Sequence, residues 1–215
     1  MKRQIVLLTK SAKDKGYCVA GIDCETKKWV RLVTSENGNT GALSKADISY
    51  FSNGQEWQFV PLDMVEVDTS DYFTKNSQTE NCLLKGKISK PLRRYSINDF
   101  ICFYSAQSPA YIYCNTREYL IKEEVRNIRY SLLFVKVQNL LIESNGNKIK
   151  ARFYYNNNFY NNFSVTDKKV YSEILDTQED KFYEESYIVV SLPALPWSDT
   201  GEDRYYKFIA QIFEI

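Results

Sequence analysis

Short stretches that alternate apolar and polar residues recur along the chain, and they predict strands rather than long helices. Gln4–Thr9 holds a β-prone apolar run, and Leu62–Asp68 alternates apolar with acidic residues, as a half-buried strand does. Tyr17–Ile22 and Lys28–Thr34 are two further segments of this kind, separated by a polar stretch, so they predict a hairpin. Cys82–Ile88 is a further strand candidate in the first half.

The second half has longer strand patterns. Tyr130–Glu143 and Lys148–Tyr155 flank an Asn-Gly pair, which tolerates positive φ at both central turn positions, so they predict a second hairpin. The asparagine-rich stretch Asn156–Asn162 is predicted to be a loop. Further strands are predicted at Phe163–Thr166, Ser186–Leu192 and Tyr205–Glu214.

Helix signals are few and short. Ser96–Tyr104 opens with a Ser-x-x-Asp capping pattern. Thr116–Asn127 has strong helix formers with spaced Glu, Lys and Arg, and it is the strongest helix prediction in the chain. Asp167–Leu175 is predicted to form one or two helical turns, with Thr166 and Asp167 acting as its N-cap.

These patterns predict a mainly β fold with a few short helices. The chain has 215 residues, which suits one large domain or two small ones. About five turn-separated strands fall in each half, which is the size of a small Greek-key barrel such as the OB-fold. We therefore predict two tandem OB-like barrels, residues 1–128 with a helical connector and residues 129–215. From the pattern alone, an SH3-like barrel or a β-sandwich remains an alternative.

The chain has no histidine, which excludes Ser-His-Asp and Cys-His catalysis and histidine-ligated zinc. Its five cysteines include no C-x-x-C spacing, so we expect reduced thiols, no metal and no cofactor. The only apolar run near the start, Ile5–Leu8, is far too short for a signal peptide or a membrane span. We expect a cytoplasmic, soluble protein that does not act on membranes, and no enzymatic activity.

The formal net charge of +1 hides an asymmetry. The first half is basic and includes the run Lys85, Lys87, Lys90, Arg93 and Arg94, whereas Asp167–Glu185 is net acidic. Basic residues interleaved with aromatic ones suit single-stranded nucleic acid, because cations neutralise phosphates and aromatic faces stack on unpaired bases. The alternative is that the lysines solvate strand edges and prevent edge-to-edge pairing.

Nine residues are candidates for binding. Trp29 and Arg31 lie two apart on a predicted strand and therefore share a face, where they can sandwich a base and hold a phosphate. Lys10 and Ser11 follow the first predicted strand and can grip phosphate from a loop. The other candidates are the polar cluster of Gln78, Glu80 and Asn81, and the basic pair of Arg93 and Arg94.

Each candidate has a structural alternative. Trp29 can be a core residue, with Arg31 in a salt bridge on the strand face. The amides and carboxylate of the cluster at 78–81 can recognise a base edge, or they can form a buried network that pins a loop. The residues alone leave both alternatives open.

Several segments in this order resemble the dual OB-containing domain family of bacterial proteins. They are Leu8-Thr9-Lys10-Ser11, Gly16-Tyr17-Cys18-Val19-Ala20-Gly21, Trp29-Val30-Arg31-Leu32-Val33, Pro61-Leu62-Asp63-Met64-Val65-Glu66-Val67, Gln78-Thr79-Glu80-Asn81, Phe163-Ser164-Val165-Thr166-Asp167, Val190-Ser191-Leu192 and Tyr206-Lys207-Phe208-Ile209-Ala210. The resemblance implies two OB-like barrels that bind nucleic acid or a nucleotide-like ligand, sometimes beside defence-type genes. It implies no catalytic activity.

The chain departs from the family pattern at three positions. Leu32 stands where the family has proline, and Ser77 and Thr79 stand where it has histidine and proline. Losing the histidine makes a catalytic role less expected in this member.

Three hypotheses of function follow. The first is a non-catalytic module for single-stranded nucleic acid or a nucleotide-like ligand. The second is a small-ligand sensor or a protein-interaction adaptor in a defence-type system. The third is a metal-dependent nuclease, for which Asp63, Glu66, Asp68 and Glu80 are the available carboxylates, without a diagnostic spacing.

Overall fold

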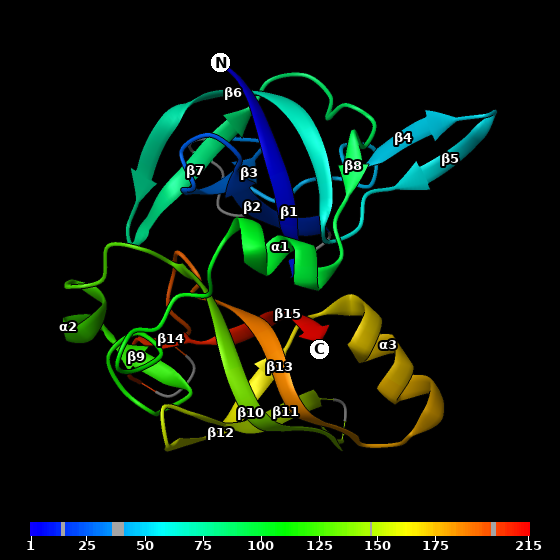
Figure 1. Ribbon diagram of the computed structural model, residues 1–215. Coiled ribbons are helices and arrows are strands. Elements are labelled where there is room, and N and C mark those ends of the chain that lie inside the picture. The colour runs from blue at the N-terminus through cyan, green and yellow to red at the C-terminus, as the bar shows by residue number, and fades with distance from the viewer. Residues whose placement is uncertain (14–15, 36–40, 147, 199–200) are drawn as a thin grey trace. The chain divides into compact units, whose positions relative to one another are not determined.

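The structure is a computed structural model that describes residues 1–13, 16–35, 41–146, 148–198 and 201–215 (Figure 1). By its internal contacts the chain forms two compact units. The first unit comprises Met1–Thr74 and Glu80–Tyr104, and the second comprises Lys75–Thr79 and Ser105–Ile215.

The units therefore divide at a different point of the chain from the predicted boundary between residues 128 and 129. The part of the predicted first half that follows Tyr104 belongs to the second unit. Its side chains Ile112, Leu120 and Val125 are buried in the second hydrophobic core, which explains why it belongs there.

The first unit is built almost entirely from strands. Its elements are β1 (Lys2–Lys13), β2 (Gly16–Asp23), β3 (Trp29–Val33), β4 (Ser49–Ser52), β5 (Gln55–Gln58), β6 (Asp63–Lys75), β7 (Gln78–Leu84), β8 (Arg93–Arg94) and α1 (Ile97–Phe103). Strands β1, β2, β3, β7 and β6 are hydrogen-bonded in that order, and pairing of β6 with β1 closes the ring. Strands β3 and β7 are parallel.

The second unit repeats this arrangement. Its elements are β9 (Tyr119–Ile121), α2 (Lys122–Val125), β10 (Leu132–Asn145), β11 (Lys148–Tyr155), β12 (Asn158–Val165), α3 (Lys168–Thr177), β13 (Lys181–Ser191), β14 (Arg204–Tyr206) and β15 (Phe208–Glu214). Strands β10, β11, β12, β15 and β13 form a closed barrel, with β12 and β15 parallel. Both units thus have the same five-strand order and the same parallel pair, so the predicted fold of two OB-like barrels is confirmed.

Alternating burial along the strands builds each core. In β11 every second residue is buried, so Phe153 and Tyr155 face the barrel interior. There Phe153 stacks on Tyr160 with ring centroids 5.2 Å apart, and Phe163 packs edge-on against both rings. This aromatic cluster fills the barrel centre with side chains, as small closed barrels require.

The strongest helix prediction was wrong over most of its length. Thr116–Asn127 contains β9 and then only the short helix α2. The reason is tertiary: Leu120 is fully buried, and β9 pairs with β14 so that Leu120 lies opposite Tyr205. Burial of this β-prone segment outweighs the intrinsic helix preference of its flanks.

The asparagine-rich stretch Asn156–Asn162 was predicted as a loop, but only its start is a turn. Asn156 and Asn157 have φ of 49° and 61°, the two positive values that a type I′ hairpin turn needs. Strand β12 begins at Asn158. The predicted hairpin between β10 and β11 is present, but its turn is shifted by one residue: Asn145 pairs with Lys148 as the end of β10, Gly146 follows with φ 62°, and Asn147 lies outside the described residues.

Two predicted helix caps are confirmed. The Asp167 carboxylate accepts from the backbone N–H groups of Lys169 and Val170 at the start of α3. Ser96 is the N-cap of α1 and accepts from the N–H of Asp99 at 3.1 Å. None of the helices in the described part of the chain is long and apolar enough to span a membrane.

Replacing the α1 cap gives the first testable prediction. Ser96→Ala leaves the Asp99 N–H without its side-chain acceptor, so we expect the free energy of unfolding to fall by about 1 kcal/mol. Urea unfolding followed by circular dichroism measures this change. Ser108→Ala, in an exposed loop, is the control and should change stability by less than about 0.5 kcal/mol. Equal effects of the two variants would contradict the capping role.

Candidate functional site

Trp29 and Arg31 do not form an open face. The Trp29 side chain is 9% exposed and Arg31 is 3% exposed. Arg31 donates from Nε and Nη2 to Glu80 Oε1 at 3.2 and 3.1 Å, and from Nη1 to Cys18 Sγ at 2.9 Å. This corrects the expectation of an exposed pair: β3 lies between β2 and β7, and all five of its residues are buried.

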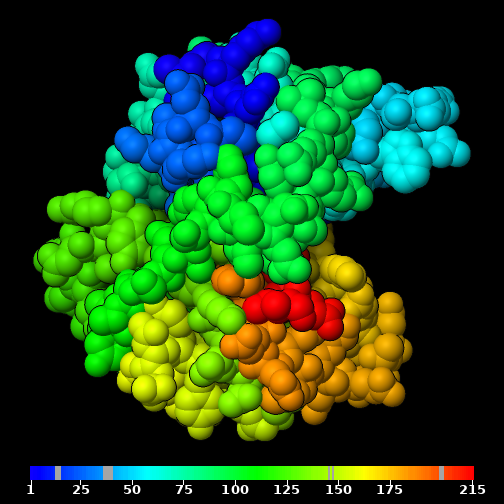
Figure 2. All heavy atoms as spheres, in the orientation of Figure 1, coloured from blue at the N-terminus to red at the C-terminus, as the bar shows by residue number. Residues whose placement is uncertain are grey.

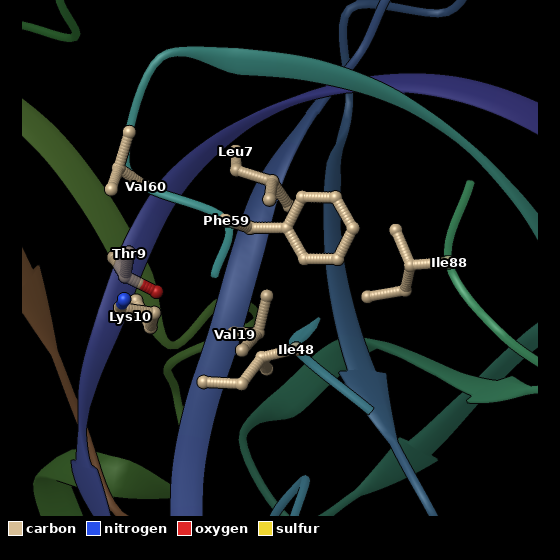
Figure 3. A pocket seen from close by; sticks show the side chains of 8 residues that line it. All are labelled: Leu7, Thr9, Lys10, Val19, Ile48, Phe59, Val60 and Ile88. Atoms are coloured by element: carbon tan, nitrogen blue, oxygen red, sulfur yellow. The ribbon is translucent and has the colours of Figure 1, made fainter. Parts of the chain in front are cut away.

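Lys10 and Ser11 lie inside a strand rather than in a loop, because β1 continues to Lys13. Ser11 is buried, and the half-buried Lys10 donates to Gln58 Oε1 at 3.3 Å. Lys10 borders a small crevice among Leu7, Phe59 and other apolar side chains (Figure 3). That crevice has no room for a water molecule, so it is core packing rather than a ligand site.

The polar cluster at 78–81 is buried as well. Glu80 bonds Arg31, and Asn81 lies opposite Arg31 where β3 pairs with β7. Gln78, which belongs to the second unit, donates from Nε2 to the carbonyl of Leu192 at 3.1 Å. These contacts favour the alternative in which the cluster pins the backbone.

Arg93 and Arg94 are the sequence candidates that the structure leaves exposed. Arg94 forms an ion pair with the fully buried carboxylate of Asp63, with Nε 2.7 Å from Oδ1, while 61% of its own side chain remains exposed. Arg93 lies over the ring of Tyr95, 4.4 Å from the centroid. Both guanidinium groups are thus oriented by neighbours and still face solvent.

An open depression lies in the second unit, where the sequence suggested no site. Its volume is about 520 Å³. It is bordered by β11, β12, the start of β15 and the segment that follows β13. Its lining includes Lys148, Lys150, Asn162, Ser164, Trp197 and Tyr206.

Aromatic side chains form one wall of this depression. Trp197 is 54% exposed and meets Tyr206 edge-on, with ring centroids 6.2 Å apart. The backbone holds this wall in place, because Trp197 exchanges two backbone hydrogen bonds with Arg204. Tyr206 also packs against Tyr119, and Arg204 covers the Tyr119 ring at 4.4 Å. An indole that is supported yet half open presents a flat stacking surface.

Lysines from β11 form a cationic part of the lining. Lys148 is exposed, and the half-buried Lys150 donates to Ser164 Oγ at 2.9 Å and to the carbonyl of Asn162 at 3.2 Å. Burial lowers the pKa of Lys150, and repulsion from Lys148 lowers it further, against the attraction of Glu118. The Glu118 carboxylate accepts from Asn162 Nδ2 at 3.3 Å. An anion bound here would stabilise the protonated form of Lys150 and raise its pKa.

Sequence reasoning missed this depression for identifiable reasons. Lys148 and Lys150 alternate with buried Ile149 and Ala151, which is a detectable signal of cations on one strand face. Trp197 lies in a loop far along the chain, and only the fold brings it near β11. Within the described ranges, no three His, Cys, Asp or Glu side chains gather as a metal site.

The family comparison agrees with the topology. The model of a family described as dual OB-containing domain matches residues 3–212. The solved structures that match include the tetrameric p202 HIN2 and the Ifi202 HINa domain in complex with 20-bp double-stranded DNA. Each is 12% identical and covers the whole of this chain and 92% or 97% of its own, with TM-scores of 0.31 and 0.34. These TM-scores are too low to show a shared fold. No curated protein matches the chain.

Proposed function

Because this chain belongs to the dual OB-containing domain family, we propose that it is a non-catalytic binding module for single-stranded nucleic acid. Its main binding surface is the depression of the second barrel. The observation that carries this proposal is the pairing of a half-open indole, Trp197, with the lysine wall of β11 around one cavity of about 520 Å³.

The position of the depression supports this role. Strands β11 and β12 are the second and third strands of the second barrel, and Trp197 lies between its fourth and fifth strands. OB-folds take oligonucleotides on the face of strands two and three, flanked by the loop between strands four and five. The depression therefore lies on the part of the barrel where OB-folds bind oligonucleotides.

The chemistry of the walls suits an unpaired strand. A base can stack on the face of Trp197, beside Tyr206, while its phosphate lies against Lys148 and Lys150. Asn162 and Ser164 add hydrogen-bonding groups at the floor. Stacking is tolerant of sequence because every base has a π-face, so we expect weak base preference.

Replacing the indole tests the proposal directly. We expect Trp197→Ala to weaken binding of a fluorescein-labelled oligothymidine about tenfold, since stacking on one aromatic contributes about 1–3 kcal/mol. Fluorescence anisotropy at several salt concentrations measures the affinity. An oligomer of about 15 nucleotides spans one OB-fold.

The controls separate stacking and charge from general damage. Phe182→Ala removes another exposed aromatic of the same unit, on β13, and should leave the affinity unchanged. Lys148→Met should reduce the slope of log affinity against log salt by about 0.7, whereas Lys122→Met, on α2, should not. If the wild type does not bind at low salt, or if its affinity does not depend on salt concentration, the proposal is refuted.

A mononucleotide is the second candidate ligand. The depression has the volume of a small-molecule site, which lies in the range of roughly 300–1,000 Å³. Competition by free mononucleotides in the same anisotropy assay distinguishes the two candidates. If free nucleotide displaces the oligomer at concentrations near the dissociation constant of the oligomer, the site is assigned to the nucleotide.

A further inference from the structure

The hairpin of β4 and β5 projects from the body of the first unit (Figures 1 and 2, cyan). It lies between the third and fourth strands of the first barrel, where the second barrel has α3 instead. Phe51 is 76% exposed and Trp57 is 51% exposed. Short two-stranded ribbons are marginally stable by themselves. Two large exposed aromatic side chains on such a ribbon therefore indicate a binding role.

The two aromatics lie on opposite faces of the ribbon. Tyr50 lies directly across from Trp57, and Phe51 lies across from Glu56. Because paired residues share a face and successive residues alternate, Trp57 projects on the side of Tyr50 and Phe51 on the other side. The ribbon is therefore a thin wedge with an aromatic surface on each face.

The wedge has a tight turn at its tip and a packing contact at its base. At its tip, Asn53 and Gly54 have φ of 52° and 77°, which closes a two-residue turn that matches the strand twist. At its base, Tyr50 packs on buried Phe59 with ring centroids 5.0 Å apart. Lys45 also forms an ion pair with Glu56 at 3.7 Å, and both side chains are exposed.

Oriented cations lie beside the base of this wedge. Strand β8, which is Arg93 and Arg94, pairs with the first residues of β6, shortly after the hairpin ends, and Figure 1 draws it next to β4. The hydrogen bond that Arg94 donates to the Asp63 carboxylate raises the pKa of Arg94, and Tyr50 of the hairpin is close enough to raise it further. Charge complementarity therefore favours an anionic occupant with flat apolar groups.

We propose that the β4–β5 hairpin is a second contact for single-stranded nucleic acid, in which Phe51 and Trp57 stack on unpaired bases and Arg93 and Arg94 hold neighbouring phosphates. This inference rests on the proposed function for its ligand class, but not on the depression of the second barrel. It gives a role to the two sequence-predicted arginines that the structure exposes.

Tryptophan fluorescence provides the test. The chain has three tryptophans, and one of them, Trp29, is buried. In a Trp197→Phe background the response to added oligothymidine therefore comes from Trp57. We expect saturable quenching of its emission, and about tenfold weaker binding by the double variant Phe51→Ala/Trp57→Ala. Arg93→Met should reduce the salt slope by about 0.7, whereas Arg126→Met, at an exposed residue just after α2, should not.

The outcomes separate the two surfaces. Quenching of Trp57 with binding that survives Trp197→Ala supports the hairpin and refutes the depression. Binding that requires Trp197 while Trp57 emission stays constant overturns the hairpin proposal alone. Absence of both binding and quenching overturns both. If Trp57 emission changes with protein concentration and not with added oligomer, the hairpin contacts a second copy of the chain and the hairpin proposal is overturned.

Discussion

Glu80→Ala should lower the free energy of unfolding by about 3–5 kcal/mol, because it leaves the Arg31 charge buried without its carboxylate. Arg31 is 3% exposed and bonds Glu80 through two nitrogens, so water cannot replace the lost partner. Urea unfolding monitored by circular dichroism measures the loss. The variant should also expose the first barrel to proteolysis at lower urea concentrations than the wild type.

An exposed pair in the same unit is the matched control for this variant. Glu56→Ala breaks the surface ion pair with Lys45 and should cost at most about 1 kcal/mol. Replacing both buried partners, as Arg31→Met with Glu80→Leu, removes the orphaned charge and should recover most of the lost stability. If Glu80→Ala is as mild as Glu56→Ala, the buried pair does not hold the barrel together.

Lys207→Met should change how the stability of the protein depends on pH. Lys207 is 1% exposed, and its ammonium donates to the carbonyl and the side-chain oxygen of Asn115. Burial lowers its pKa from 10.5 to about 7. Between these values the unfolded chain carries a proton that the folded chain lacks, so the contribution of Lys207 to stability rises with pH.

The size of this effect follows from the pKa values. Between pH 7 and about pH 9, the wild type should gain roughly 2 kcal/mol relative to Lys207→Met. Urea unfolding of both proteins across this range measures the difference, and the titration of tyrosines and cysteines cancels between them. Lys122→Met is the control, because Lys122 is exposed and should give a curve parallel to the wild type. Parallel curves for wild type and Lys207→Met would show that Lys207 is charged in the folded protein.

The two barrels share one topology but differ in their accessories. The connection between the third and fourth strands is a projecting hairpin in the first barrel and α3 in the second. The first barrel buries its conspicuous polar residues in ion pairs, including Arg3 with Asp23 at 3.0 Å. The exposed aromatic and cationic side chains that could bind a ligand therefore lie outside this core, at Phe51, Trp57 and the arginines of β8.

Much of the fold was predictable from local pattern. Alternation predicted the strands of both barrels, and capping residues such as Ser96 and Asp167 predicted helix starts, because these signals act over a few residues. The failures came where burial overrode local preference. Thr116–Asn127 has helix formers, but Leu120 is recruited into the second core and Tyr119–Ile121 becomes strand β9.

The sequence by itself determined a strand-rich chain without histidine, the pairing of its hairpins and a basic pair at Arg93 and Arg94. It also placed Trp29 and Arg31 two residues apart on one strand, but period-two spacing does not reveal whether a neighbouring layer covers the face. Only the tertiary structure decided that this face is buried, and that Trp197 meets the β11 lysines around an open depression. The physical reason is that exposure depends on residues distant in sequence, which close over one strand and leave another open.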